Sequence, residues 1–354
     1  LPSPASSLVA VAFAVVATGT ATWRATSATA APAPASLSRG TLSVYEFEQY
    51  LGMITDSIRV RAYLQALEEV ITPGCSVVEI GTGLGFFAFA ALRLGAAKVF
   101  AIECSPSIEI ARSLCRANGL EDRCFFYEQD SRTVELPERC DVLLSDLRGG
   151  LPFHGNHIQV LQDARTRFLK PGGRMIPWRD QHFACLTRAF PLEASLALPG
   201  PDPFDWTPCL QRLQHQATRW WGQEKELLTP AQKLGEWNYT TVSQPDFQAT
   251  AAWTVSQPAS IGGVLVWFDA QLTEAVSFSN SPTEVASPRS YGQTCCSVWP
   301  PLLVEAGATV CLDWKAKSMK KDYALCWEVG SSGVWRRNCS LFAKARPRGD
   351  QPIR

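Results

Sequence analysis

Residues 76–105 constrain the fold of this chain more than any other stretch. A short apolar run at 76–80 leads into three alternating glycines at 81, 83 and 85, then into an alanine-rich run at 86–92 and a second apolar run at 99–103. This order predicts a strand, a tight turn, a helix and a second strand, which together make a βαβ unit. The mouth of such a unit can bind a nucleoside-containing ligand.

The glycine spacing helps to identify the ligand. A dinucleotide-binding loop has the pattern G-x-G-x-x-G, which would put its third glycine at position 86, where this chain has Phe86. The pattern here is G-x-G-x-G, so Gly81, Gly83 and Gly85 can form a sharp turn that lets a ligand approach the backbone closely.

Two acids complete the predicted binding loop. Glu103 ends the second strand, where its carboxylate could accept hydrogen bonds from two ribose hydroxyls. Glu79 directly precedes the turn and suits a ligand with a cationic amino group better than a pyrophosphate. The combination favours S-adenosylmethionine over NAD, and the alternative is a strand, turn and helix without a ligand.

Composition limits the class of protein. The chain has 354 residues, of which 46% are hydrophobic, and its 33 basic and 33 acidic residues cancel. The balance gives no overall attraction to nucleic acid or to an anionic membrane. Twelve cysteines include no C-x-x-C pair, so they predict small core residues in a reduced compartment, with neither a metal site nor a disulfide framework.

The segment 1–44 differs from the rest of the chain. It is rich in Ala, Ser, Thr and Pro, and no acid precedes Glu46. An apolar stretch at 8–17 is too short to span a bilayer but fits the core of a signal peptide, and the acid-free composition fits an organelle transit peptide equally well. A disordered tail is the third reading. The localisation therefore stays open between cytoplasmic, organellar (plastid-type) and secreted.

A Rossmann-like α/β domain is predicted for residues 45–177. A helix over 45–70 precedes the first strand and could close over the ligand, with Arg59 or Arg61 available for a carboxylate. Later strands at 124–128, 142–144 and from 175 onward complete a doubly wound parallel sheet. The carboxyl ends of parallel strands share one edge, so Asp130, Ser131 and Asp146 are expected in the same crevice as the glycine turn.

A second domain is predicted for residues 178–340. Short alternating runs separated by Pro, Gly, Ser and Asn indicate an antiparallel β-barrel or sandwich. Residues 191–223, Pro-rich and then aromatic, indicate an inserted arm, which is a candidate for homodimer contacts. The remaining segment, 341–354, is a basic tail.

These motifs resemble those of the protein arginine methyltransferases over about residues 45–330. The segments that carry the resemblance are 53–59, 79–85, 94–99, 118–123 and 134–137. The resemblance implies that Arg59 holds the carboxylate of S-adenosylmethionine, that Glu103 binds its ribose, and that Asp130 and Ser131 lie beside its adenine. For the contact with this carboxylate, the resemblance favours Arg59 over Arg61.

The chain departs from that family where the acceptor binds. The family holds its substrate guanidinium with two glutamates in the loop after the fourth strand, and this chain has Asp146 at the first position and Gly155 at the second. The family's Thr-His-Trp segment is replaced within residues 289–292. Carboxylates orient a guanidinium and localise its charge, so the loss of one carboxylate removes a charge-assisted contact of about 1.5–3 kcal/mol.

Three functional hypotheses follow. Asp146 is the predicted catalytic residue of a methyltransferase, with a protein arginine side chain as the first acceptor and a small molecule or another nitrogen or oxygen as the second. A non-catalytic S-adenosylmethionine-binding module is the third. The pair His154 and His157 lacks a third ligand at metal-site spacing, and Tyr291 is expected to pack in the barrel rather than in the site.

Overall fold

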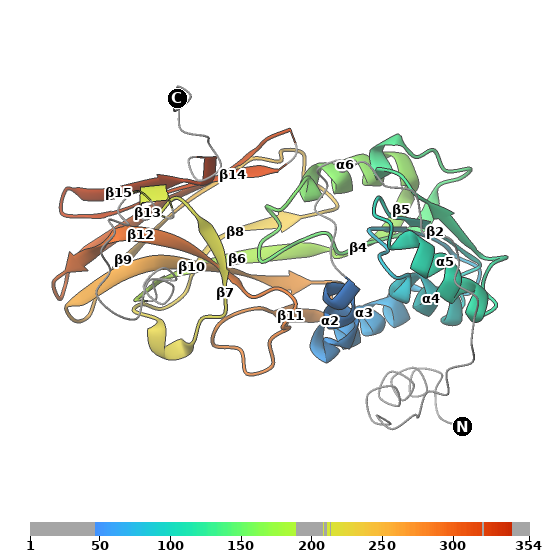
Figure 1. Cartoon of the computed structure of the whole chain (residues 1–354), viewed down its shortest axis with the longest axis horizontal. Helices are drawn as coiled ribbons and strands as arrows, with labels where there is room; N and C mark the ends of the chain where they lie inside the picture. The colour runs from blue at the N-terminus through green and yellow to red at the C-terminus, as the bar shows by residue number, and fades with distance from the viewer. Residues whose placement is uncertain (1–46, 189–207, 209–210, 213, 321, 342–354) are drawn as a thin grey trace, which may run out of the picture.

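The computed structural model describes residues 47–188, 208, 211–212, 214–320 and 322–341. The predicted segment 1–44, most of the predicted arm and all but the first residue of the predicted basic tail therefore lie outside the described residues. In the part that is described, no helix is both long enough and apolar enough to cross a membrane. In Figure 1 the parallel sheet and its helices form the right half of the molecule, and the antiparallel strands form the left half.

The single helix expected over 45–70 is two helices. Helix α2 (Phe47–Thr55) ends before Asp56, and α3 (Ser57–Val70) begins after it. Asp56 is the N-cap of α3, and its side chain accepts a hydrogen bond from the backbone N–H of Arg59. An aspartate favours this position because its carboxylate satisfies an N–H that has no partner within the helix.

The parallel sheet has the strand order β3-β2-β1-β4-β5. Its strands are β1 (Ser76–Ile80), β2 (Lys98–Ile102), β3 (Cys124–Tyr127), β4 (Cys140–Ser145) and β5 (Leu169–Ile176), and its helices are α4 (Phe86–Arg93), α5 (Ile108–Ala117), α6 (His157–Phe168) and the short 3-10 helix η1 (Ser131–Thr133). From β1 the chain first adds β2 and β3 on one side of the sheet, and then adds β4 and β5 on the other side. In sheets of this kind, ligands bind outside the carboxyl ends of the strands at the point where the order changes side, which here lies between β1 and β4. The predicted fold class is confirmed, although β5 starts six residues before the predicted start at Met175.

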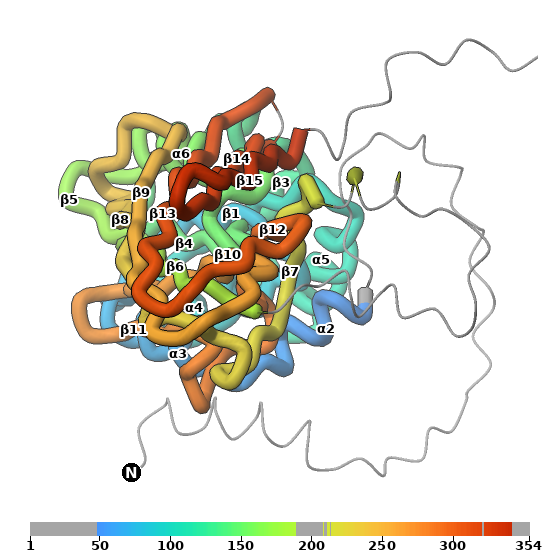
Figure 2. Tube along the Cα trace, turned by 90° about the vertical axis from the view of Figure 1, so that its left-hand side faces the viewer, coloured from blue at the N-terminus to red at the C-terminus, as the bar shows by residue number. Residues whose placement is uncertain are grey.

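The second half consists of two antiparallel sheets. One contains β7 (Ala217–Trp220), β12 (Gln293–Val304), β10 (Ala259–Gln271), β6 (Arg179–Thr187) and β8 (Gln232–Asn238), with β11 (Ser277–Ser279) paired to β10. The other contains β15 (Val334–Cys339), β14 (Tyr323–Ser331), β13 (Thr309–Ser318) and β9 (Phe247–Thr254), and the 3-10 helix η2 (Glu224–Glu226) follows β7. Figure 2 looks at the molecule from this end.

Two expectations for the second half need correction. Residues 217–220 were predicted within the arm, but they form strand β7 and pair with residues 293–296 of β12. Cys326 and Cys339 lie opposite each other in β14 and β15 and form a disulfide, whereas the sequence predicted none. Cysteine spacing cannot reveal this bond because the register of the two strands decides which side chains meet.

The two halves share a hydrophobic core. Phe153, from the loop between β4 and α6, inserts among aromatic side chains of the antiparallel half, with ring centroids 5.2 Å from Trp314 and 5.5 Å from Phe247 and Tyr323. Aromatic pairs at these distances stabilise beyond the area that they bury. This packing fixes the loop that follows Asp146 and includes Gly155 against the barrel.

Candidate active site

A cavity of about 720 Å³ lies at the carboxyl ends of the parallel strands. Its walls come from α2 and α3, the glycine turn, the loops after β2, β3 and β4, and the barrel segment 289–291. Eight of the nine predicted site residues line it: Arg59, Glu79, Gly81, Gly83, Glu103, Asp130, Ser131 and Asp146.

The glycine turn shapes one wall of the cavity. Gly83 has φ +56°, and a Cβ built there would lie 2.9 Å from the ring of Tyr50 on α2. Gly85, the ninth predicted residue, does not line the cavity; it precedes α4 with φ +83°, and a Cβ there would lie 2.5 Å from the ring of Phe89. Gly85 therefore shapes the turn from behind rather than providing a surface for a ligand.

Glu103 is held in position by the backbone. Its two carboxylate oxygens accept hydrogen bonds from the N–H groups of Gly83 and Ser105, each at 2.9 Å. An ionised carboxylate has about four acceptor positions, so further positions stay available to donors in the cavity. This geometry suits a pair of ribose hydroxyls.

Glu79 is a buried acid in the cavity wall. Its side chain is held by the Thr82 hydroxyl at 2.5 Å. Burial raises the pKa of Glu79 from 4.5 to about 7, and no described basic side chain forms an ion pair with it. A buried carboxyl that faces a cavity without a cationic partner fits a ligand with an ammonium or sulfonium group. The residues present therefore fit S-adenosylmethionine.

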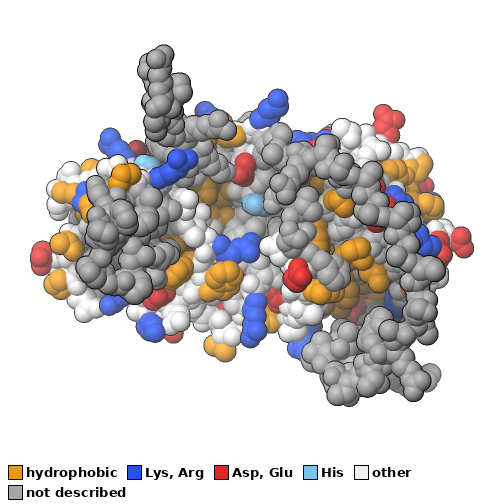
Figure 3. All heavy atoms as spheres, in the orientation of Figure 1, with side chains coloured by type: hydrophobic (Ala, Val, Ile, Leu, Met, Phe, Trp, Pro, Cys, Tyr) orange, Lys and Arg blue, Asp and Glu red, His pale blue; other side chains and the backbone are white. Residues whose placement is uncertain are grey.

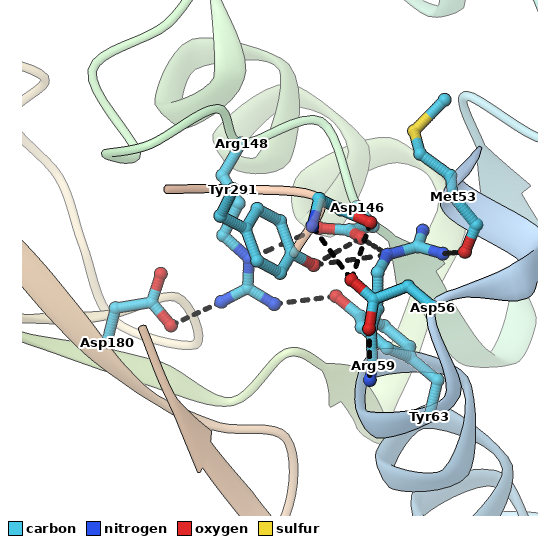
Figure 4. Close-up of polar contacts among 9 residues, drawn as sticks. Met53, Asp56, Arg59, Tyr63, Asp146, Arg148, Asp180 and Tyr291 are labelled. Carbon is cyan, nitrogen blue, oxygen red and sulfur yellow. Dashed lines mark hydrogen bonds and ion pairs between the residues drawn. The ribbon is translucent and has the colours of Figure 1, made fainter. Parts of the chain in front are cut away.

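Asp146 is already bound by three donors (Figure 4). Its Oδ2 accepts from Arg59 Nε and from the Tyr291 hydroxyl, both at 2.7 Å, and its Oδ1 accepts from Arg148 Nε at 3.2 Å. Burial alone would raise the pKa of Asp146, but the charges of Arg59 and Arg148 lower it. Asp146 is therefore ionised and neutralised by this chain's own arginines, whereas the sequence predicted a carboxylate available to an acceptor.

Arg59 is shared between the cavity and the protein. Besides its contact with Asp146, its Nη1 donates to the backbone oxygen of Met53 at 3.2 Å. Burial would lower the pKa of Arg59, but the charge of Asp146 raises it. Arg59 was predicted to bind the carboxylate of a cofactor. That contact would use the donors of the guanidinium that still face the cavity, and the role stays a prediction.

Arg148 connects the site to the antiparallel half. Its Nη1 donates to Asp180 of β6 at 2.5 Å, and its Nη2 donates to the Tyr63 hydroxyl of α3 at 2.6 Å. Asp180 also accepts from the Tyr239 hydroxyl at 2.7 Å. The Arg148 and Asp180 side chains are fully buried, and burial raises the pKa of Asp180. Figure 4 shows this chain of contacts running from Asp180 to Arg59.

The sequence missed the barrel's contribution to the site. Tyr291, predicted to pack in the barrel alone, lines the cavity and binds Asp146, although it does also stack on Phe278. Ser290 donates twice to Asp56, from its backbone N–H at 2.8 Å and from its hydroxyl at 2.7 Å. More than 200 residues separate Ser290 from Asp56, and no local pattern signals such a pair.

The remaining predicted residues, Asp130 and Ser131, line the cavity after strand β3. Asp130 lines the cavity, but its carboxylate binds Arg132 through Nε at 2.9 Å and Nη2 at 2.5 Å. These contacts lower the pKa of Asp130. Ser131 is buried in η1, and the proposed adenine contacts of both residues stay predictions.

The position of the family's second glutamate carries no acid. Gly155 lines the cavity with φ +55°, and a Cβ there would have open space around it. His154 and His157 also line the cavity, and burial lowers the pKa of His157 to about 3. Within the described residues no group of three His, Cys, Asp or Glu side chains could hold a metal ion.

The sequence of the chain is similar to those of known methyltransferases. A profile of the family "Ribosomal protein L11 methyltransferase (PrmA)" matches residues 60–177. The arginine N(omega)-methyltransferase of Streptomyces achromogenes subsp. streptozoticus is 28% identical over 272 residues, which cover 74% of each chain. The histone-arginine methyltransferase CARMER of Anopheles gambiae is 24% identical over 304 residues, and the match spans 74% of this chain but 45% of that protein.

Solved structures share the whole architecture. The Trypanosoma brucei PRMT1 enzyme-prozyme complex with AdoHcy superimposes with a TM-score of 0.73 at 18% identity, covering 83% of this chain and 98% of that one. Arabidopsis thaliana protein arginine methyltransferase 10 gives a TM-score of 0.70 at 20% identity, covering 83% and 98%. With the glycine turn, the two acids and the barrel in place, the chain is similar to class I methyltransferases of the protein arginine methyltransferase type in its sequence and shares their fold.

Proposed function

We propose that this chain is an S-adenosylmethionine-dependent methyltransferase of the arginine methyltransferase type. The proposal rests on one observation: Glu79, Glu103 and the glycine turn line the same cavity as the barrel segment 289–291. The arrangement provides a cofactor half and an acceptor half within one cavity, so both reactants could be held next to each other, as methyl transfer requires.

The chain's own residues would bind and orient the two reactants. When bound, S-adenosylmethionine supplies a methyl group on a sulfonium, and the acceptor's lone pair bonds to that carbon while the carbon–sulfur bond breaks and its electrons stay on sulfur. Glu103 would hold the ribose, Glu79 would face the cationic end, and Arg59 would face the carboxylate. Asp146 would lie on the acceptor side.

An arginine guanidinium is the first candidate acceptor. The Streptomyces relative is named for activity on arginine and the mosquito relative for activity on histone arginine. Asp146 is the one acid that this chain keeps in the family's acceptor loop, and its contacts with Arg59 and Arg148 mean that a guanidinium would have to share its lone pairs.

Titration calorimetry tests the cofactor. S-adenosylhomocysteine should bind the full chain, and Glu103→Ala should weaken binding at least tenfold because the hydrogen bonds to a carboxylate are lost. Glu121→Ala, at an exposed acid outside the cavity, is the matched control. Binding of NAD with none of S-adenosylhomocysteine would contradict the proposal.

Radiolabelled S-adenosylmethionine tests the reaction. After incubation with an arginine-containing peptide, label should appear in methylarginine by amino-acid analysis, and Asp146→Asn should lower the rate. Label found only outside methylarginine would mean that the acceptor has changed. Unchanged activity in Asp146→Asn would exclude this residue from orienting the acceptor.

A non-catalytic cofactor-binding module is the second candidate. The observation in its favour is that three donors from the protein itself occupy Asp146. Proven cofactor binding, with no label transferred to protein, RNA or small-molecule fractions, would select this candidate.

A further inference from the structure

Five acids of the described residues line the cavity, and each of them accepts a hydrogen bond from another group of the protein. Hydroxyl or backbone N–H donors hold Asp56, Glu79 and Glu103, and arginines hold Asp130 and Asp146. Among the described residues, each acid that lines the cavity therefore already accepts at least one hydrogen bond from the protein.

The arginines that line the cavity are not balanced in the same way. Arg59, Arg132 and Arg148 form ion pairs with acids. Arg219 and Arg289 also line the cavity and are exposed, but among the described residues neither has a carboxylate partner. Two cations are thus left over on the side of the cavity that the barrel forms.

These two arginines come from adjacent segments of the barrel. Arg219 lies in β7 directly opposite Thr294 at the start of β12. The segment that carries Arg289 leads into that strand, and a Cβ built on Gly292 would lie 3.1 Å from Cγ of Arg219. Lys and Arg side chains, in blue, also stand near the middle of the face shown in Figure 3.

The charges beside the barrel point to a group that the acceptor carries. Asp146 is neutralised by Arg59 and Arg148, and Asp56, Glu79 and Glu103 have no arginine partner, so Arg219 and Arg289 are not paired with any of the described acids that line the cavity. An anionic group of the acceptor would meet two arginines that present planar forks of donors.

We propose that Arg219 and Arg289 hold a carboxylate or phosphate group of a small methyl acceptor. The inference rests on the proposed function and names the substrate class for the same cavity. A free amino acid carries an α-carboxylate, whereas the α-carboxyl of a residue inside a peptide chain is part of an amide bond. Arginine forks bind both carboxylates and phosphates in bidentate fashion, so the two anions share one recognition chemistry.

Calorimetry with two small anions tests this site directly. Malonate and inorganic phosphate are titrated separately into the full chain saturated with S-adenosylhomocysteine. At least one should bind saturably, with a Kd that rises at least tenfold in the double variant Arg219→Gln/Arg289→Gln and stays unchanged in Arg123→Gln, an exposed arginine outside the cavity. The preferred anion distinguishes a carboxylate from a phosphate acceptor.

Two results would overturn the inference: no saturable binding of either anion, or equal affinity in the double variant. S-adenosylhomocysteine binding is measured in the same samples. Intact cofactor binding without anion binding refutes this inference alone, whereas loss of cofactor binding in the unaltered chain refutes the proposed function.

Methyl transfer gives an independent readout. A small-molecule extract is freed of proteins and peptides by ultrafiltration and divided by chromatography, and each fraction is incubated with radiolabelled S-adenosylmethionine and the enzyme. Label should appear in a small molecule that carries a carboxylate or phosphate group and fall at least tenfold in the double variant. Label confined to an arginine peptide would contradict a small acceptor with such a group.

Discussion

Glu79 shows how one buried side chain can make the stability of the molecule depend on pH. Its pKa rises from 4.5 to about 7 because burial disfavours the carboxylate. The unfolded chain therefore loses this proton at lower pH than the folded chain does. Glu79 therefore reduces the free energy of unfolding. The reduction is small below pH 4.5, grows as the pH rises, and is constant above about 7.

We expect Glu79→Gln to stabilise the protein at pH 8. The difference between 4.5 and about 7, at about 1.4 kcal/mol per pH unit, gives a gain of about 3 kcal/mol in the free energy of unfolding. The gain should shrink to under about 1 kcal/mol at pH 5. Urea unfolding at the two pH values measures it, and an equal change at both would show that Glu79 does not titrate as stated.

The same residue gives a signature of cofactor binding. A cation that binds beside Glu79 favours the carboxylate and lowers its pKa, so binding at pH 6 should release part of a proton. Calorimetry of S-adenosylmethionine binding in buffers of different ionisation enthalpy counts the protons. Glu79→Gln should abolish the release; a release that survives the substitution comes from another group.

Gly155 allows a test of the missing glutamate. Its left-handed φ of +55° costs a larger residue about 1–2 kcal/mol, but the space around it is open. We expect Gly155→Glu to raise methylation of an arginine peptide about tenfold, because one charge-assisted contact is regained. Gly172→Glu, also at a left-handed and open position but away from the cavity, controls for backbone strain. No gain would direct attention to the segment 289–291.

At the scale of elements, the break between α2 and α3 ties the cavity to the barrel. Asp56 caps α3 and accepts two hydrogen bonds from Ser290. The two helices (blue in Figure 1) thereby meet the barrel segment that carries Tyr291. One aspartate thus both ends a helix and positions a wall of the site.

Asp56→Ala should lower the free energy of unfolding by about 2–3 kcal/mol, because it removes the cap and leaves Ser290 without an acceptor. Ser290→Ala, which keeps the cap, should cost about 1 kcal/mol. Thr55→Ala, at the preceding exposed residue, is the control. Urea denaturation measures all three, and equal losses from Asp56→Ala and Thr55→Ala would show that the link contributes nothing.

At the scale of the whole molecule, Arg148 joins the two halves. It leaves the loop after β4 and binds Asp180 of the barrel, and both side chains are fully buried. A buried pair adds little stability over apolar residues, but removing one partner leaves an uncompensated charge. The contact therefore makes the halves depend on each other.

Arg148→Met should cost about 3–5 kcal/mol, because Asp180 is left buried without its counter-charge. The double variant Arg148→Met/Asp180→Asn should recover part of that loss. Arg337→Met, which removes an ion pair whose side chains are 71% and 39% exposed, should cost under about 1 kcal/mol. Equal losses from the buried and the exposed arginine would contradict the role of Arg148.

Local patterns were sufficient to predict the parallel half, and its residues expected to bind the cofactor stay predictions. The first strand, the glycine turn, the helix and the acids Glu79 and Glu103 lie within residues 76–105, and the hydrophobic pattern of this stretch indicates the type of each element. The later strands of the barrel were found from their alternation, but their partners and several of their neighbours, such as β6, β9 and β15, were not.

Only the tertiary structure decided the acceptor side. The sequence alone identified Asp146 and the absence of an acid at Gly155, because both lie in one loop. It could not show that Arg59 and Arg148 neutralise Asp146 and that Tyr291 donates to it, because the packing of the two halves brings these groups together. Nor could it show that, among the described residues, Arg219 and Arg289 line the cavity without an acid partner. Charge balance in a cavity is a property of neighbours in space, and it is therefore absent from any local pattern.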